Sequence, residues 1–307
     1  MRPSALRTFA ALLLTLTAGS AAWAQTWELR LSPQFGSIRF SVEGLANTTV
    51  GGVFIERLRS ETSVPAYGLT ADLAGEVGRG FLIGARLTGV WTGTGNWITS
   101  ALGNLGPSGY ANLTFDVQTQ QQAAFGFTAG DIRVGLTRPA GERLSLTAFI
   151  GAGWRQFLLR SNGGTTSSTI CDTSTTSPTC TTTTASFTGG TIPLSSPTFG
   201  AGLAITVPGH EWTFRSELGY SALTNVEMGS GIVIPGAGPA VTTTGQEWSV
   251  RVFLERPLSK TLTLSVGYDG TFSRIVQAGT QTIYGETPSL PVAGQIQMLS
   301  VVLVWRF

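Results

Sequence analysis

The sequence predicts an all-β fold: a single closed, antiparallel transmembrane β-barrel of about ten strands. Three observations carry this prediction. The chain ends on an alternating stretch in which every second residue from Leu299 to Phe307 is apolar, which is the period of a strand. Charged residues make up only 12% of the chain, which is low for an exported soluble protein. Beyond the N-terminal leader, no apolar stretch approaches the 18 or so residues of a membrane-spanning helix.

The N-terminus predicts a secretory signal peptide over residues 1–24, followed by the barrel over 25–307. Arg2 and Arg7 give a positive start, an apolar run covers 9–16, and Ala22 and Ala24 flank Trp23 in a small-x-small cleavage site. The apolar run is shorter than the roughly 20 residues that cross a bilayer as a helix. We therefore expect cleavage before Gln25 rather than a helical anchor.

Charge excludes one class of partner. The full chain has 19 Lys and Arg against 17 Asp and Glu, so removal of the two leader arginines leaves a neutral exported protein. A neutral chain does not favour nucleic acid as a partner. No cofactor is expected.

The expected strands follow one plan of apolar residues alternating with small or polar ones. They lie within 27–42, 67–77, 81–91, 132–136, 144–154, 199–207, 212–220, 248–254, 262–272 and 299–307. Four tight turns with Gly or Pro join them at 78–80, 139–142, 208–211 and 256–260. Five long connections alternate with these turns, at about 44–65, 93–124, 161–197, 224–246 and 274–294. An even strand number places both termini on one side; eight or twelve strands remain alternatives.

Two strands break the plan. In the first, the apolar phase changes from Trp27, Leu29 and Leu31 to Ile38 and Phe40, with Pro33 between them. A β-bulge would explain this change. The fourth strand shows a similar change near 129–130. The stretches at 110–118 and around 53–55 also alternate, so we interpret them as hairpin extensions above the membrane.

Aromatic residues predict two girdles on the apolar face, as expected where rings sit at both headgroup levels. The girdle at the short-turn end comprises Trp27, Phe81, Trp212, Trp305 and Phe307, and the girdle at the long-loop end comprises Tyr67, Trp91, Trp154, Tyr220, Trp248 and Phe272.

The leader, the alternating hairpins and the terminal run resemble those of bacterial outer-membrane β-barrel proteins. The run Leu299, Val301, Leu303, Trp305 and Phe307 is similar to the C-terminal signal that the barrel-assembly machinery reads. The resemblance implies a place in the bacterial outer membrane with periplasmic termini, contact with outer-membrane lipid, and the assembly machinery as a partner during biogenesis. Ten-stranded relatives include outer-membrane proteases and adhesins.

Inward positions carry charges of both signs. These are Asp72, Glu76, Arg86, Asp131, Arg133, Arg155, Arg215, Glu217, Arg251, Glu255 and Asp269. Buried charges must be paired or hydrated, and a ten-stranded barrel leaves little room beyond its own side chains. Balanced signs therefore favour a lumen filled by ion pairs over a selective pore, whose ring usually carries one sign.

The sequence predicts no enzymatic activity and no catalytic, cofactor-binding or metal-binding residue. His210 is the only histidine, and it lies in a tight turn expected on the periplasmic side. The hydroxyl residues of 161–197 lack a histidine base nearby, which leaves them weak nucleophiles.

Cys171 and Cys180 are the only cysteines, and in an exported protein we expect them to form a disulfide within the connection 161–197. The expected function is a non-enzymatic structural or surface-interaction role, with an extracellular ligand at the long loops. The alternative is a narrow, porin-like channel for small solutes.

Overall fold

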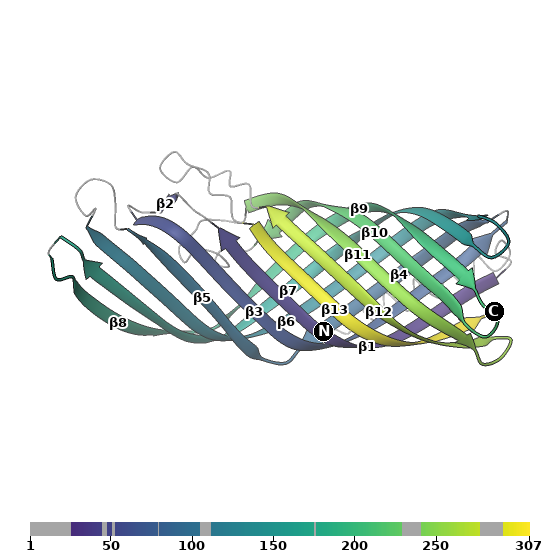
Figure 1. Ribbon diagram of the computed structural model, residues 1–307, viewed down its shortest axis with the longest axis horizontal. Coiled ribbons are helices and arrows are strands. Elements are labelled where there is room, and N and C mark those ends of the chain that lie inside the picture. Colours follow the sequence, from purple (N-terminus) through teal and green to yellow (C-terminus); the bar gives the residue numbers. More distant parts are fainter. Residues whose placement is uncertain are drawn as a thin grey trace.

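Thirteen β-strands make up almost all of the described part of the chain in this computed structural model (Figure 1). The structure describes residues 26–44, 48–50, 53–78, 80–104, 112–174, 176–228, 241–276 and 291–307. The strands are β1 (Thr26–Gly44), β2 (Thr48–Val50), β3 (Val53–Val77), β4 (Phe81–Thr92), β5 (Gly95–Asn104), β6 (Leu113–Pro139), β7 (Ser145–Asp172), β8 (Thr179–Phe187), β9 (Gly190–Pro208), β10 (Thr213–Met228), β11 (Val241–Pro257), β12 (Leu262–Val276) and β13 (Pro291–Arg306). The predicted leader, 1–24, lies outside these residues. Within them, no helix is long and apolar enough to cross a membrane.

Ten of the strands close into a ring through antiparallel pairing. The order around the ring is β1, β3, β4, β6, β7, β9, β10, β11, β12, β13 and back to β1. The first and last strands complete it: the Trp27 N–H donates to the Phe307 carbonyl at 2.9 Å, and the Phe307 N–H donates to the Trp27 carbonyl at 3.0 Å. Closure satisfies every strand edge of the ring, as a hydrocarbon surrounding requires. The predicted closed barrel of ten strands is confirmed.

The outer face of the ring is apolar. Along β13 and the residue after it, Leu299, Val301, Leu303, Trp305 and Phe307 are all at least 36% exposed, whereas the alternate residues Met298, Ser300, Val302 and Val304 are at most 5% exposed. The same alternation holds on β9 and β12, where Leu203 and Val266 point outward. An apolar surface that continues around a whole ring is expected where lipid covers it.

The girdle expected at the short-turn end lies at strand ends, where Phe81, Trp212, Trp305 and Phe307 are exposed and Trp27 is partly buried. Most of the second girdle lies within strands that continue beyond it; there Tyr67, Trp154, Tyr220 and Trp248 are exposed and Trp91 and Phe272 are partly buried. Rings of adjacent strands meet in pairs, with 4.8 Å between the Tyr220 and Trp248 centroids. The expected girdles did not include Phe35, which is more exposed than all of these residues, or Phe199, which is more exposed than all of them except Phe307.

The expected bulge in the first strand is wrong. β1 pairs with β3 without a register shift from Thr26 to Gly44, and Pro33 lies in that register opposite Leu69. The apolar residues change face instead: Ile38 and Val42 point into the lumen and are 2% exposed, while Arg39 points outward. The change of phase expected near 129–130 has the same explanation, because β6 pairs with β4 without a register shift across 126–136. A change of hydrophobic phase therefore marks a change of surroundings and not a break in the strand.

Between the level of this change and the end opposite the short turns, the interior of the barrel is apolar. Buried residues from opposite walls form one cluster: Ile38, Val64, Ala66, Val90, Trp97, Ala123, Phe125, Phe127, Ala129, Leu159, Ile296 and Met298. The outward face is polar at this level. The pattern is that of a water-soluble barrel, so the strands leave the hydrocarbon and continue into an aqueous phase.

Five strands carry the sheet beyond the ring. We call this part the extension; it comprises β5, β8 and the segments of β3, β6 and β7 that pair with them, and it projects at the left of Figure 1. Much of the expected long connections at 44–65, 93–124 and 161–197 is therefore strand. The hairpin extensions expected at 110–118 and around 53–55 are confirmed for the described residues, in β6 and in the β2–β3 hairpin.

A single row of residues separates ring from extension. Gly95, Ala123, Ser161 and Gly190 pair across four strands. The breaks between β4 and β5 and between β8 and β9 lie beside this row, and so does a register shift in β7 at Gly163, whose φ is +87°. Bulges bend and twist a sheet locally. Three irregularities at one level therefore let the sheet leave the cylinder.

Substitution by arginine should distinguish an apolar residue that faces lipid on the ring from one that faces water on the extension. Leu203→Arg on the lipid face (58% exposed) should destabilise the folded barrel in lipid vesicles by about 2–4 kcal/mol, the cost of a cation near the bilayer midplane. Ile98→Arg in the extension (51% exposed) should change stability by less than about 0.5 kcal/mol. Urea unfolding in vesicles measures both, and equal losses would contradict the assigned membrane level.

Candidate functional site: an ion-pair network across the lumen

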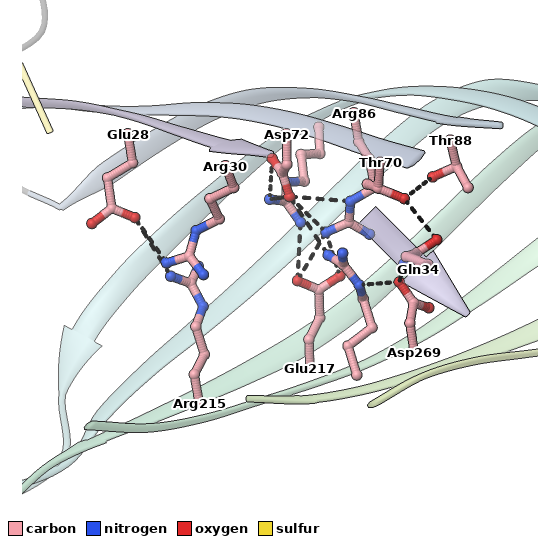
Figure 2. A network of polar contacts seen from close by, with 12 residues as sticks. Glu28, Arg30, Gln34, Thr70, Asp72, Arg86, Thr88, Arg215, Glu217 and Asp269 are labelled. Carbon is pink, nitrogen blue, oxygen red and sulfur yellow. Dashed lines mark hydrogen bonds and ion pairs between the residues drawn. The ribbon is translucent and has the colours of Figure 1, made fainter. Parts of the chain in front are cut away.

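Charged side chains fill the half of the lumen toward the short-turn end. They come from inward positions of the membrane-spanning strands, where the other residues are mostly small or polar. They come from β1, β3, β4, β6, β7, β10, β11 and β12, so nearly every wall of the ring contributes. Figure 2 shows how the central members point toward one another. Some ion pairs join neighbouring strands, such as Arg86 with Asp72, whereas others, such as Arg155 with Glu247, join strands that are not neighbours and so tie opposite walls together.

The central layer is organised by two carboxylates. Asp72 accepts hydrogen bonds from Arg133 at 2.9 and 3.0 Å and from Arg86 at 3.0 and 3.1 Å. Glu217 accepts from the same two arginines, at 2.9 Å from Arg86 and 3.0 Å from Arg133. Arg251 closes the layer through Asp269 at 2.8 Å. Polar contacts extend it, since the Gln34 amide donates to Asp269 at 3.4 Å and the Thr70 hydroxyl donates to Gln34 at 3.3 Å.

A second layer of ion pairs lies on the side of the central layer that faces the extension. Arg155 of β7 reaches Glu247 of β11 across the lumen, with contacts of 2.8 to 3.2 Å. The same guanidinium donates to Asp131 at 2.8 Å. One cation here faces two carboxylates.

The third layer lies toward the short-turn end. Arg30 of β1 donates to Glu255 of β11 at 2.6 Å and to Glu28 at 2.9 Å. Glu28 also accepts from Arg306 at 2.8 Å and lies 3.7 Å from Arg215. Three cations here face two carboxylates.

Ten of the eleven charges expected in the lumen lie in these layers: Asp72, Arg86, Asp131, Arg133, Arg155, Arg215, Glu217, Arg251, Glu255 and Asp269. Glu76 does not join them; it lies exposed at the rim with no ion pair to the described residues. Sequence reasoning missed three further charges. Glu28 and Arg30 hold inward positions within the expected strand 27–42, and Glu247 lies one residue before the expected strand 248–254, so the period-two count would have found all three.

The free space around the network is small. A cavity of about 10 Å³ adjoins Arg30 and Arg215, and another of about 50 Å³ lies between the central layer and Arg155. One water molecule needs about 10–15 Å³ measured this way, so these spaces suit single waters or a few of them, not a passing solute. The arrangement can brace the walls and seal the lumen.

The tip of the extension is the second candidate site. Cys171 and Cys180 form the predicted disulfide, which links β7 to β8. All nine residues of β8 are exposed, and hydroxyls line the two strands, as in the 2.9 Å contact between Thr169 and Thr182. Beyond the disulfide, the backbone N–H and side chain of Ser174 hydrogen-bond to Asp172, which holds the pKa of that carboxyl below its ordinary value.

His210 lies exposed in the turn between β9 and β10, at the short-turn end. The Gly209 N–H donates to the Trp212 carbonyl at 2.8 Å to close this turn. No network residue contacts the imidazole among the described residues, so the structure gives it no part in the sites above.

Comparison with solved structures gives the fold. The chain resembles the outer-membrane protease OmpT from Escherichia coli with a TM-score of 0.58 and 12% identity, over 92% of this chain and 97% of that one. Weaker matches are the translocator domain of the autotransporter NalP from Neisseria meningitidis (TM-score 0.28, 10% identity, 98% and 96% coverage) and the Pseudomonas putida toluene transporter TodX (TM-score 0.28, 11% identity, 94% and 92% coverage). No protein-family model and no curated protein matches the chain.

The match to OmpT overturns the expectation that the chain is not an enzyme. That expectation took two grounds against catalysis: the position of His210 in a turn, and the lack of a histidine base near the hydroxyl residues of 161–197. A protease shares this fold along nearly its whole length, so neither a ten-stranded ring nor its strand extensions argue against an enzyme. At 12% identity the comparison transfers no residue role.

The central layer should be sensitive to loss of one carboxylate. Asp72→Asn removes the charge shared by Arg86, Arg133 and Arg251, so we expect a loss of about 3–5 kcal/mol in unfolding free energy. The control Glu61→Gln removes an acid that pairs with Arg39 and Arg59 outside the barrel, and should cost less than about 1 kcal/mol. Urea unfolding in vesicles compares the two; a similar small effect for both would show that the layer does not brace the ring.

Proposed function

We propose that the protein is a bacterial outer-membrane barrel whose sealed lumen anchors the extension as a binding surface outside the cell. The predicted leader supports export, and the terminal run from Leu299 to Phe307 supports insertion by the barrel-assembly machinery. Both ends of the ring's chain meet at the short-turn end. We assign that end to the periplasm, because short turns face the periplasm in barrels of this class and longer segments face outward.

The observation that carries the proposal is the free edge of the extension. Within the described residues β8 hydrogen-bonds to β7 alone, and its nine residues carry no charge. Exposed edge strands accept a further strand from a partner through backbone hydrogen bonds, with side-chain rows giving specificity. Charges, prolines or covering elements usually block such edges, and β8 has none of these among the described residues. An extended, uncharged peptide segment rich in hydroxyl or amide groups fits this edge.

The disulfide supports the same role. It joins Cys171 to Cys180 directly across the β7–β8 pair and so limits the conformations of the tip. A tip that is already ordered loses less entropy when a partner binds.

Truncation of the tip tests the proposal. Replacing residues 166–185 by Asn-Gly should leave the ring intact, because those residues pair within the extension only. We expect the truncated protein to keep the heat-modifiable electrophoretic mobility of a folded barrel. Binding of cells that display it to an immobilised panel of surface peptides and glycans should fall by at least about tenfold, because the strand-addition interface is lost.

The matched control replaces residues 140–143, at the opposite end, by Asn-Gly, and should bind as the parent does. Binding that survives tip truncation would overturn the assignment of the extension. Because the fold is shared with a protease, peptide cleavage is measured on the same variants, so that recognition and catalysis are distinguished.

A narrow channel is the second candidate, and the small cavities beside the network weigh against it. In planar bilayers we expect no steady openings from the parent protein at neutral pH. Replacing Arg133 and Glu217 together by Ala removes one bridge across the lumen and should produce measurable conductance. Steady openings of the parent protein would make the channel the better proposal.

A further inference from the structure

The free edge of β8 has a composition that suits pairing with a second copy of itself. Five of its nine residues are threonine and one is serine, and all nine are exposed and uncharged. The segment that fits this edge is extended, uncharged and rich in hydroxyl groups, and β8 itself meets that description. Two such edges can meet without the like charges that keep many edge strands from pairing with their own copies.

Pairs of hydroxyl groups already join the strands of the extension as far as this edge. Thr119 of β6 contacts Thr166 of β7 with 3.1 Å between the hydroxyl oxygens, and Thr169 of β7 contacts Thr182 of β8 at 2.9 Å. Thr–Thr pairs across neighbouring strands stabilise a sheet. Within the described residues no strand pairs with the other side of β8, so the rows stop there. A second β8 would continue them.

The sequence of β8 favours one register for such a pair. Opposed residues of an antiparallel pair point to the same face of the sheet, so a twofold-symmetric pair places one residue opposite its own copy. A pair centred on Thr183 opposes Thr182 with Thr184 and uses the whole strand from Thr179 to Phe187. A centre one residue away would leave two residues unpaired at one end of each strand.

The symmetry of this pair decides where the second copy sits. The twofold axis of an antiparallel edge pair is perpendicular to the sheet, so it reverses every direction that lies in the sheet. β6 and β7 run from the ring into the extension, which therefore lies roughly along the barrel axis (Figure 1). The axis is reversed with the strands, so the two rings point in opposite directions. Two copies in one membrane point the same way, whereas copies in two facing membranes point in opposite directions.

We propose that the protein binds a second copy of itself across two facing membranes, through antiparallel pairing of two β8 edges centred on Thr183. This inference rests on the proposed function and names its partner. The two extensions form one continuous sheet, and the rows of hydroxyl groups run through it. The disulfide holds each β8 against β7 before contact, so that less conformational entropy is lost on pairing.

Pairing of vesicles tests the inference. The protein is reconstituted into two batches of phospholipid vesicles, one with a donor dye and one with an acceptor dye, and mixing should produce energy transfer between them. Thr183→Lys sets two like charges opposite each other at the centre of the pair. It should lower vesicle pairing at least about tenfold, because every contact between two vesicles is weakened. The control Thr165→Lys adds the same charge at an exposed position of β7, away from the edge, and should pair as the parent does.

A cross-link measures the register. Thr183→Cys should form a disulfide between two copies under mild oxidation, because its Cβ atoms would lie about 5 Å apart across the pair. Thr181→Cys should not, since it would face Ala185 of the second copy. Parent vesicles that do not pair, or equal cross-linking of the two variants, would overturn the inference.

The peptide and glycan panel separates this inference from the proposed function. Parent protein that binds the panel through its tip but does not pair vesicles would remove self-association alone. Failure of both would remove the binding role of the edge as well.

Discussion

The closure of backbone hydrogen bonding around the ring is the constraint on which the rest of this structure depends. Hydrocarbon offers no partner to an unpaired N–H or carbonyl, so each strand in the membrane must be paired on both sides. The pairing of β1 with β13 meets that requirement at the one place where the chain could have left an edge. Once the cylinder is closed, alternate side chains have only two destinations, lipid or lumen. The ion-pair network follows, because charges directed inward must find partners across the lumen.

The same strands serve two solvents in succession. Toward the short-turn end their apolar residues face outward and their charges face inward, whereas beyond the level of Ile38 and Ala129 this arrangement is reversed. The backbone register is continuous through the change in β1. The reversal places an apolar core directly above the charged layers, so two chemically different fillings close one lumen. Beyond that core the sheet opens at the row of Gly95, Ala123, Ser161 and Gly190.

Much of the fold could be predicted from the sequence, because a period of two shows directly which residues face lipid. The strand number, the tight turns and the disulfide are as the pattern indicated. The bulge at Pro33 was wrong, since the reasoning assumed that apolar residues always face outward and so attributed their change of phase to the backbone. The extension was largely treated as loop because its threonine and glutamine residues carry no apolar stripe, and only pairing with β6 and β7 reveals it as sheet. Most lumen charges were identified, but the partner of each depends on which walls face one another, and a single sequence does not contain that information. Arg155 and Glu247, for example, are 92 residues apart.

The disulfide joins the two strands that reach farthest from the membrane, and this has a mechanical consequence. β7 continues past the irregularity at Gly163 from the short-turn end to Asp172, so a pull on the tip loads its hydrogen bonds along the strand axis. Bonds loaded in this direction must break together, whereas bonds loaded across a strand open one after another. The covalent link also transmits the load to β8 and from there toward β9. A pull on this tip would therefore reach the ring of the barrel along two paths, β7 itself and β8 followed by β9, rather than along one strand.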